Sequence, residues 1–141
     1  MRFWLLVSFL VFCGPYAQAQ EKPPSLPFSK AVRVGDMLYL SGELGSVPGT
    51  AGLVPGGITA ETRQTMENIK ATLTENGSDM DHVVKCLVML ADIGEWAQMN
   101  AVYRTYFKSR FPARSAMGAS GLALGARVEI ECIATVRNES R

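Results

Sequence analysis

Alternating apolar positions near the end of the chain predict its last strand, over residues 127–136. The apolar positions recur at every second residue: Val128, Ile130, Cys132, Ala134 and Val136. A period of two is the pattern of a strand with one buried face. The intervening residues are Glu129, Glu131, Ile133 and Thr135. We therefore expect a strand that packs one side into a core and turns two carboxylates to the other side.

Residues 83–90 form a second strand, which is apolar on both sides apart from Lys85. Its two sides are Val84, Cys86, Val88 and Leu90 on one, and Val83, Leu87 and Met89 on the other. The helices of so short a chain can cover only one face of a sheet. We therefore expect another copy of the chain to cover the second face.

Turn and capping signals define the remaining elements. They predict a hairpin of strands over 31–34 and 37–42, a long loop over 43–58, helices over 59–76 and 93–108, and a strand over 115–119. Thr59 is the expected N-cap of the first helix, and Asp92 and Glu95 form a capping pair for the second. The side of the second helix that faces the core is expected to consist of Trp96, Met99, Tyr103, Tyr106 and Phe107. The order β-β-α-β-α-β-β indicates an α+β domain, with one mixed sheet and two helices on one face.

The first nineteen residues have the layout of a secretory signal peptide. Arg2 precedes an apolar run over residues 3–13, and Ala17-Gln18-Ala19 supplies small residues at a cleavage site. We expect cleavage after Ala19, which leaves residues 20–141 as a single domain in the periplasm or outside the cell. No membrane association is expected after cleavage.

Charge and cysteine content narrow the classes of function. The formal charge is +1, and removal of Arg2 with the signal would leave 13 basic and 13 acidic residues. Such a balance gives no electrostatic basis for binding nucleic acid. Cys86 and Cys132 remain, and we expect them to serve as small apolar core residues. A disulfide between them is the alternative that an oxidising compartment would permit.

Familiar catalytic motifs are absent from the sequence. His82 is the only histidine, and its position at a strand start indicates a surface residue. The chain has no nucleophile elbow, phosphate-binding loop or dinucleotide fingerprint. Its acidic residues are scattered, so no metal site is expected.

The segment Phe111-Pro112-Ala113-Arg114-Ser115 places an arginine where a loop enters a strand. Glu129 follows fifteen residues later, on the polar face of the strand that we expect to be its neighbour in the sheet. The pattern allows two interpretations. Arg114 and Glu129 can form a salt bridge at a subunit interface. Alternatively, the guanidinium binds a substrate carboxylate in bidentate fashion while Glu129 orients or deprotonates water.

The same residues resemble the signature of the RidA family, also called the YjgF family. The resemblance covers residues 27–137 and rests on Pro112-Ala113-Arg114-Ser115-Ala116-Met117, residues 118–122 and Val128-Glu129-Ile130. Further matches are Pro27-Phe28-Ser29, Leu40-Ser41-Gly42, residues 62–70, Val83-Val84-Lys85 and residues 100–107. The resemblance implies a chorismate-mutase-like fold and a homotrimer with three clefts between subunits.

It also implies an enzyme, a deaminase of the 2-iminobutanoate/2-iminopropanoate type that hydrolyses enamines and imines to 2-oxo acids and ammonia without a cofactor. By the same resemblance Arg114 would grip the substrate carboxylate and Glu129 would activate water. Ser41, Gly42 and the backbone at Ala116 would line the pocket, and Phe28 would stack across the cleft. The alternatives are a trimeric protein that binds small 2-oxo or amino carboxylates without turnover, and a chaperone-like interaction protein.

Three positions depart from the family pattern. Phe28 stands where many members have tyrosine, Glu43 follows Ser41-Gly42 where glutamine is commoner, and Ala116 replaces a cysteine that some members carry. The export signal is a further departure, because pyridoxal-phosphate enzymes generate the damaging imines in the cytoplasm. An exported member is therefore expected to meet a different substrate.

Overall fold

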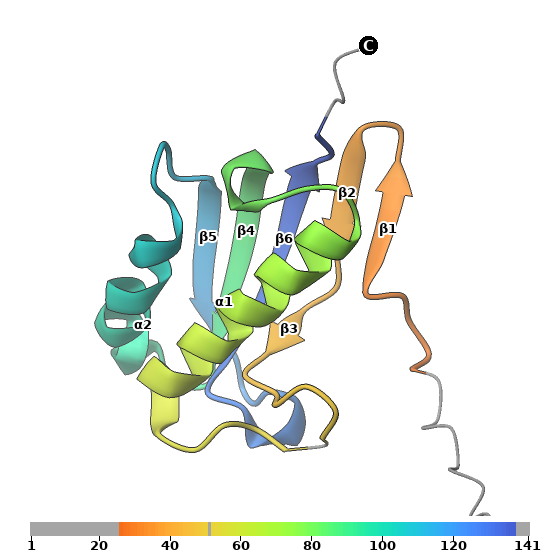
Figure 1. Cartoon of the computed structure of the whole chain (residues 1–141). Helices are drawn as coiled ribbons and strands as arrows, with labels where there is room; N and C mark the ends of the chain where they lie inside the picture. The colour runs from red at the N-terminus through yellow and green to blue at the C-terminus, as the bar shows by residue number, and fades with distance from the viewer. Residues whose placement is uncertain (1–25, 51, 138–141) are drawn as a thin grey trace, which may run out of the picture.

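A mixed sheet with both helices on one face forms the domain in the computed structural model, which describes residues 26–50 and 52–137 (Figure 1). In chain order the elements are β1 (Ala31–Val34), β2 (Met37–Leu40), β3 (Glu43–Leu44), α1 (Gly57–Glu75), β4 (Val83–Leu90), α2 (Trp96–Tyr103), β5 (Ala113–Gly118) and β6 (Val128–Thr135). The strand order is β1-β2-β6-β4-β5, and β3 also pairs with β6. Only β4 and β5 run parallel; the other pairs are antiparallel. The predicted α+β order is confirmed, with β3 added, while the expected signal peptide lies outside the described residues.

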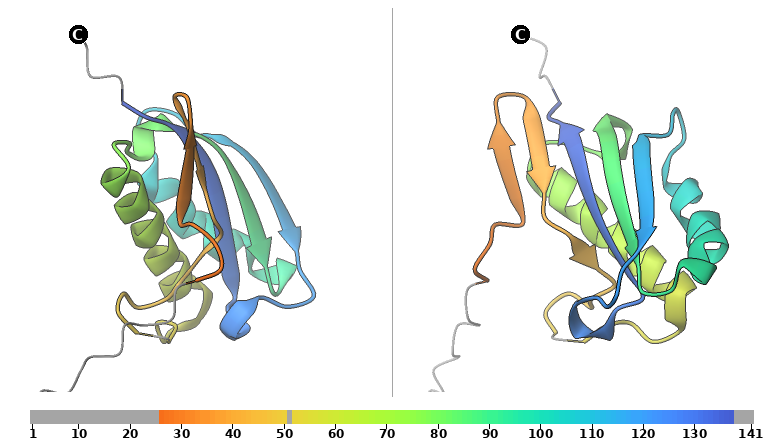
Figure 2. Two further views of the ribbon diagram at one scale, coloured as in Figure 1. Left: turned by 90° about the vertical axis from the view of Figure 1, so that its right-hand side faces the viewer. Right: turned by 180° about the vertical axis from the view of Figure 1, so that it is seen from behind.

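The core lies between the sheet and the helices, as the two turned views show (Figure 2). Val128, Ile130, Cys132 and Ala134 of β6 are at most 1% exposed, which confirms the predicted apolar side of that strand. Helix α1 packs Met66, Ile69 and Leu73 onto it, all with no exposed surface. Within residues 26–50 and 52–137, no helix is both long and apolar enough to cross a membrane.

The opposite side of the sheet, which we call the outer face, has no layer over it in this chain (Figure 2). Large apolar side chains on it stay half exposed: Val32, Val34, Tyr39 and Met117. Isolated exposed apolar residues are ordinary, but several on one sheet face indicate an interaction surface. That a second copy covers this face stays a prediction.

Several predicted details were wrong, and the structure gives a physical reason for each. A register shift between Val83 and Lys85 against β6 turns Val83 into the core, so Val83 is 2% exposed and Val84 is not buried. The assignment of these two valines to the faces of β4 was therefore reversed, because a bulge breaks strict alternation.

Helix α1 begins before the expected cap at Thr59. Gly56 is its N-cap residue, with φ 113°, and Gly57 follows with φ 70°. Both values suit glycine, so the glycine pair makes the turn into the helix without a side-chain cap. The loop before it contains the short strand β3, which pairs Glu43 with Ile130 and Leu44 with Glu129.

The second helix is shorter than the predicted 93–108. A 3₁₀ turn over Ile93–Glu95 precedes α2, and another over Arg104–Tyr106 follows it. Asp92 accepts a hydrogen bond from the Gly94 backbone N–H (2.8 Å). The expected reciprocal capping by Glu95 does not form, since its carboxylate accepts hydrogen bonds from Arg127 instead.

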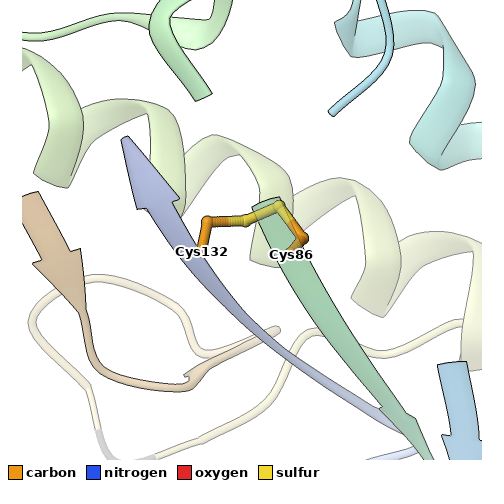
Figure 3. Close-up of a disulfide and its surroundings, with 2 residues drawn as sticks. All are labelled: Cys86 and Cys132. Atoms are coloured by element: carbon orange, nitrogen blue, oxygen red, sulfur yellow. A yellow bond between two sulfur atoms is a disulfide. The ribbon is translucent and has the colours of Figure 1, made fainter. Parts of the chain in front are cut away.

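Cys86 and Cys132, expected to be separate apolar side chains, form a disulfide (Figure 3). The antiparallel register of β4 and β6 places them directly opposite each other, with their Cα atoms 4.1 Å apart. Spacing along the sequence does not reveal this register, so the sequence offered the disulfide only as the alternative to two separate apolar side chains. The bond closes a loop between residues 46 apart in sequence and lies in the core, where both residues are 1% exposed.

Glu43 is expected to destabilise the fold at neutral pH. Burial raises the pKa of its carboxyl, although the Thr72 hydroxyl (3.1 Å) and Lys30 oppose this shift. Glu43→Gln removes the charge and retains an oxygen that can accept from Thr72. We expect its thermal midpoint at pH 7 to exceed that of the wild type by a few degrees.

The higher thermal midpoint of Glu43→Gln should disappear as the pH falls through the raised pKa of Glu43 in the folded state toward the pKa of an ordinary glutamate. Below that pH the wild-type carboxyl is neutral as well. Thermal unfolding of both proteins from pH 4 to pH 8 measures this dependence. Glu43→Ala, which also removes the acceptor for Thr72, is the comparison. An equal gain at both ends of the pH range would contradict the interpretation.

Candidate functional site

Arg114 lies on β5, the edge strand of the sheet, on the side that faces the helices. In the parallel register it stands beside Cys86 of β4. Its guanidinium donates a hydrogen bond to Oδ1 of Asn100 on α2 (2.6 Å). Its Cζ lies 4.8 Å from the ring centroid of Tyr103 and 5.7 Å from that of Trp96. An amide oxygen and two aromatic rings therefore hold the orientation of this half-buried cation.

No carboxylate of residues 26–50 or 52–137 lies within 4.0 Å of the Arg114 guanidinium. A guanidinium carries five N–H donors in a planar fork, which matches a carboxylate. One of these donors is used by the neutral Asn100 side chain. The residue thus has the charge and the free donors needed to bind an anion.

A cavity of about 360 Å³ opens beside this arginine. Its lining residues are Asn100, Tyr103, Arg104, Phe111, Pro112 and Arg114. Burial raises the pKa of the Tyr103 hydroxyl to about 12, against the opposing charge of Arg114, so the phenol stays protonated near neutral pH. The volume suits a small molecule rather than a polymer.

Glu129 occupies the other side of the sheet. It pairs with Met89 of β4 and Leu44 of β3, and it is half-buried on the outer face. A Cβ atom built on Gly42 would collide with Oε1 of Glu129. Only glycine at position 42 therefore lets the carboxylate rest against the bend between β2 and β3, and the two candidate site residues Gly42 and Glu129 lie side by side.

Ser41 lies at the same bend, and Phe28 directly precedes Ser29, one of the residues hydrogen-bonded to Ser41. The Ser41 hydroxyl donates a hydrogen bond to the backbone carbonyl of Ser29 (2.7 Å), and its N–H donates to that of Lys30 (2.9 Å). These bonds attach the segment carrying Phe28 to the bend. The Phe28 ring is 54% exposed and has no layer over it in this chain.

Within one chain the predicted site residues fall into two separate groups. Arg114 and Ala116 belong to β5 on the helix-facing side, whereas Glu129 belongs to β6 on the outer face. The expectation that β5 and β6 are neighbours was wrong, because β4 lies between them. Arg114 and Glu129 of one chain therefore lie on opposite sides of the sheet, and a salt bridge within the chain is excluded.

Sequence reasoning did not single out the residues that position Arg114. Trp96, Asn100 and Tyr103 recur at helical spacing on one side of α2, and the sequence predicts Trp96 and Tyr103 as core residues. Tyr103 is indeed 3% exposed, whereas Trp96 is 43% exposed beside the guanidinium. The polar Asn100 within an apolar helix face was the available signal.

His82 is half-buried rather than fully exposed. Its Nδ1 lies 2.6 Å from Oδ1 of Asp79. Burial raises the pKa of Asp79, but the hydrogen bonds from His82 and from the Asp81 backbone outweigh it and the net shift is downward. Within the described ranges 26–50 and 52–137, no group of three or more histidine, cysteine or acidic side chains could hold a metal ion.

Comparisons with known proteins agree with these observations. The family model described as Endoribonuclease L-PSP matches residues 19–136. The 2-iminobutanoate/2-iminopropanoate deaminase of Capra hircus is 47% identical over 108 residues, covering 77% of this chain and 79% of that protein. The Homo sapiens deaminase is 43% identical over 108 residues, with the same coverage.

Solved structures give the same result. The crystal structure of RidA from the Antarctic bacterium Psychrobacter sp. PAMC 21119 superposes with a TM-score of 0.76 at 37% identity, covering 84% of this chain and 97% of that one. A Rid-family protein from Yersinia pestis gives a TM-score of 0.77 at 39% identity, covering 84% and 96%. The chain belongs to the RidA family, whose model carries the description Endoribonuclease L-PSP.

Proposed function

We propose that this protein is a deaminase that hydrolyses reactive 2-imino acids and their enamine tautomers to 2-oxo acids and ammonia. The observation that carries the proposal is the Arg114 guanidinium, held in orientation by Asn100 and Tyr103 with no carboxylate from the described residues against it. Relatives of 43–47% identity are named as deaminases of this class. The cavity beside Arg114 has the volume of a small-molecule site.

We also propose that the complete site is shared between copies of the chain, arranged as the homotrimer that the resemblance implies. One chain places Arg114 and Glu129 on opposite sides of its sheet. A second copy seated against edge strand β5 can bring its Glu129 and Phe28 to the Arg114 of the first. The exposed apolar residues of the outer face support an assembly of this kind.

In this mechanism the guanidinium binds the substrate carboxylate and fixes the imine carbon relative to a water molecule. Glu129 accepts a proton from that water as its oxygen bonds to C2, and passes the proton to the nitrogen that receives the C=N electron pair, which gives a carbinolamine. Glu129 then accepts the proton of the carbinolamine hydroxyl and delivers it to nitrogen, so that the C–N bond breaks, ammonia leaves and the C=O of the 2-oxo acid forms. Imines hydrolyse readily in water, so orientation and one proton acceptor suffice without a covalent intermediate or a cofactor.

Export to the periplasm or the cell exterior is part of the proposal. The Cys86–Cys132 disulfide supports it, because disulfides persist in oxidising compartments and are rare in the cytoplasm. The substrate would then be an imine formed or released outside the cytoplasm.

Arg114→Ala is expected to lower kcat/KM for 2-iminopropanoate roughly 100-fold or more, because the desolvated carboxylate loses the guanidinium that binds it. Arg114→Lys should recover little of this, since an ammonium lacks the planar fork. Ammonia release on imines generated in situ by an amino-acid oxidase gives the rate. Light scattering should show the wild-type assembly in both variants, and near-wild-type turnover by Arg114→Ala would refute the assignment.

Glu129→Gln is expected to lower kcat by roughly 10²–10⁴-fold, the usual contribution of a general base. Binding of 2-oxobutyrate, measured by calorimetry, should stay close to that of the wild type because Arg114 is intact. This combination separates an enzyme from a binding protein. Wild-type protein that binds 2-oxobutyrate but releases no ammonia above the uncatalysed rate would favour the non-catalytic alternative.

Gly42→Ala tests the position of Glu129 rather than its identity. The added Cβ would occupy the space of the carboxylate, so Glu129 must move and kcat should fall at least about tenfold. Gly121→Ala is the matched control, because a Cβ there meets no atom within 4 Å. Equal activity of the two variants would show that the Gly42–Glu129 contact has no role in the reaction.

A further inference from the structure

Basic residues are concentrated in the part of the chain that builds the cavity. Residues 96–128 contain no aspartate or glutamate, while they include Arg104, Lys108, Arg110, Arg114 and Arg127. Arg127 is neutralised by Glu95, whose carboxylate accepts its hydrogen bonds. The segment from α2 to β5 therefore carries several basic side chains and has no acidic residue of its own to neutralise them.

Arg104 is the second cation that lines the cavity beside Arg114. It directly follows α2 and lies four residues after Asn100, so the two share one side of the helix. Asn100 is the residue that holds Arg114. Among the residues that the structure describes, no carboxylate lies within 4.0 Å of the Arg104 guanidinium.

A single cavity thus has two arginines and no acidic residue in its lining. A substrate with one carboxylate balances only one of these charges. A second anionic group on the same molecule would balance the other and lower the repulsion between the two guanidinium groups. The remaining lining, which includes Phe111 and Pro112, offers a short apolar wall for the carbon chain between the two anionic groups.

We propose that the preferred substrates are imines of dicarboxylic amino acids, such as 2-iminosuccinate and 2-iminoglutarate. Arg114 binds the carboxylate next to the imine carbon, and Arg104 binds the carboxylate at the far end. The inference rests on the proposed deaminase function and names the substrate class of that same site. The second carboxylate takes no part in bond making: water adds to C2 and ammonia leaves as before.

The test compares Arg104→Met with Arg110→Met in the full chain. Arg110 is exposed in the same basic segment and is not among the residues that line the cavity, so its replacement makes an equal change in net charge. Imines are generated in situ by amino-acid oxidases from aspartate, glutamate, alanine and 2-aminobutyrate. The quantity measured is the ratio of kcat/KM for each dicarboxylate imine to that for 2-iminopropanoate.

We expect Arg104→Met to lower this ratio about tenfold through a higher KM for the dicarboxylates, and Arg110→Met to leave the ratio at its wild-type value. Arg104→Glu should lower the ratio further by repulsion. The wild-type ratio should also decrease as ionic strength rises, because Arg104 is exposed to solvent and its interactions are screened.

If the ratio of kcat/KM values measured for Arg104→Met equals that of the wild type, the inference is overturned. Normal hydrolysis of 2-iminopropanoate in the same experiment would leave the deaminase proposal intact. Loss of the assembly in Arg104→Met, seen by light scattering, would likewise overturn the inference by assigning Arg104 to a subunit interface. The absence of hydrolysis of any imine by the wild type would instead refute the deaminase function itself.

Discussion

The alternation of side chains along β6, β4 and β5 is the constraint on which the rest of the structure depends. These strands pair in a fixed register, so every residue is assigned either to the helix-facing side or to the outer face. The helix-facing side of β6 and β4 forms the core under α1 and contains the disulfide. Because α1 and α2 cover only that side, the outer face keeps apolar residues available for another copy.

The same alternation makes the site incomplete in one chain. Arg114 shares the helix-facing side with the core, and its position at an edge strand leaves it open to a neighbour. Glu129 and Gly42 meet on the opposite side, where the bend after β2 approaches β6. In the proposed mechanism activity therefore requires assembly. A chain that does not associate has Arg114 to bind the substrate carboxylate but no Glu129 beside it to accept a proton.

Sequence reasoning succeeded where a single periodic pattern determines the structure. Strand β6, the bounds of β4 and the apolar stripe of α1 all follow from the spacing of apolar residues. It failed where the outcome depends on a partner distant in sequence. The faces of Val83 and Val84 depend on a bulge against β6, Glu95 is diverted from capping by Arg127, and the pairing of Cys86 with Cys132 depends on strand register. Asn100 was missed for the same reason, because only the fold brings it to Arg114.

The disulfide also bears on how the two halves of the site are related. Cys86 stands beside Arg114 across β4 and β5, and Cys132 belongs to β6, the strand that carries Glu129. The disulfide therefore links β4, the strand that neighbours Arg114, to β6, the strand that carries Glu129. In a closed ring each chain would contribute Arg114 to one cleft and Glu129 to another. The ring closes with identical clefts only if every chain holds these two residues in the same relative position. The cross-link limits movement of β4 relative to β6, and so limits changes in the relative position of Arg114 and Glu129. The only disulfide of the described residues therefore supports the geometry of the proposed clefts.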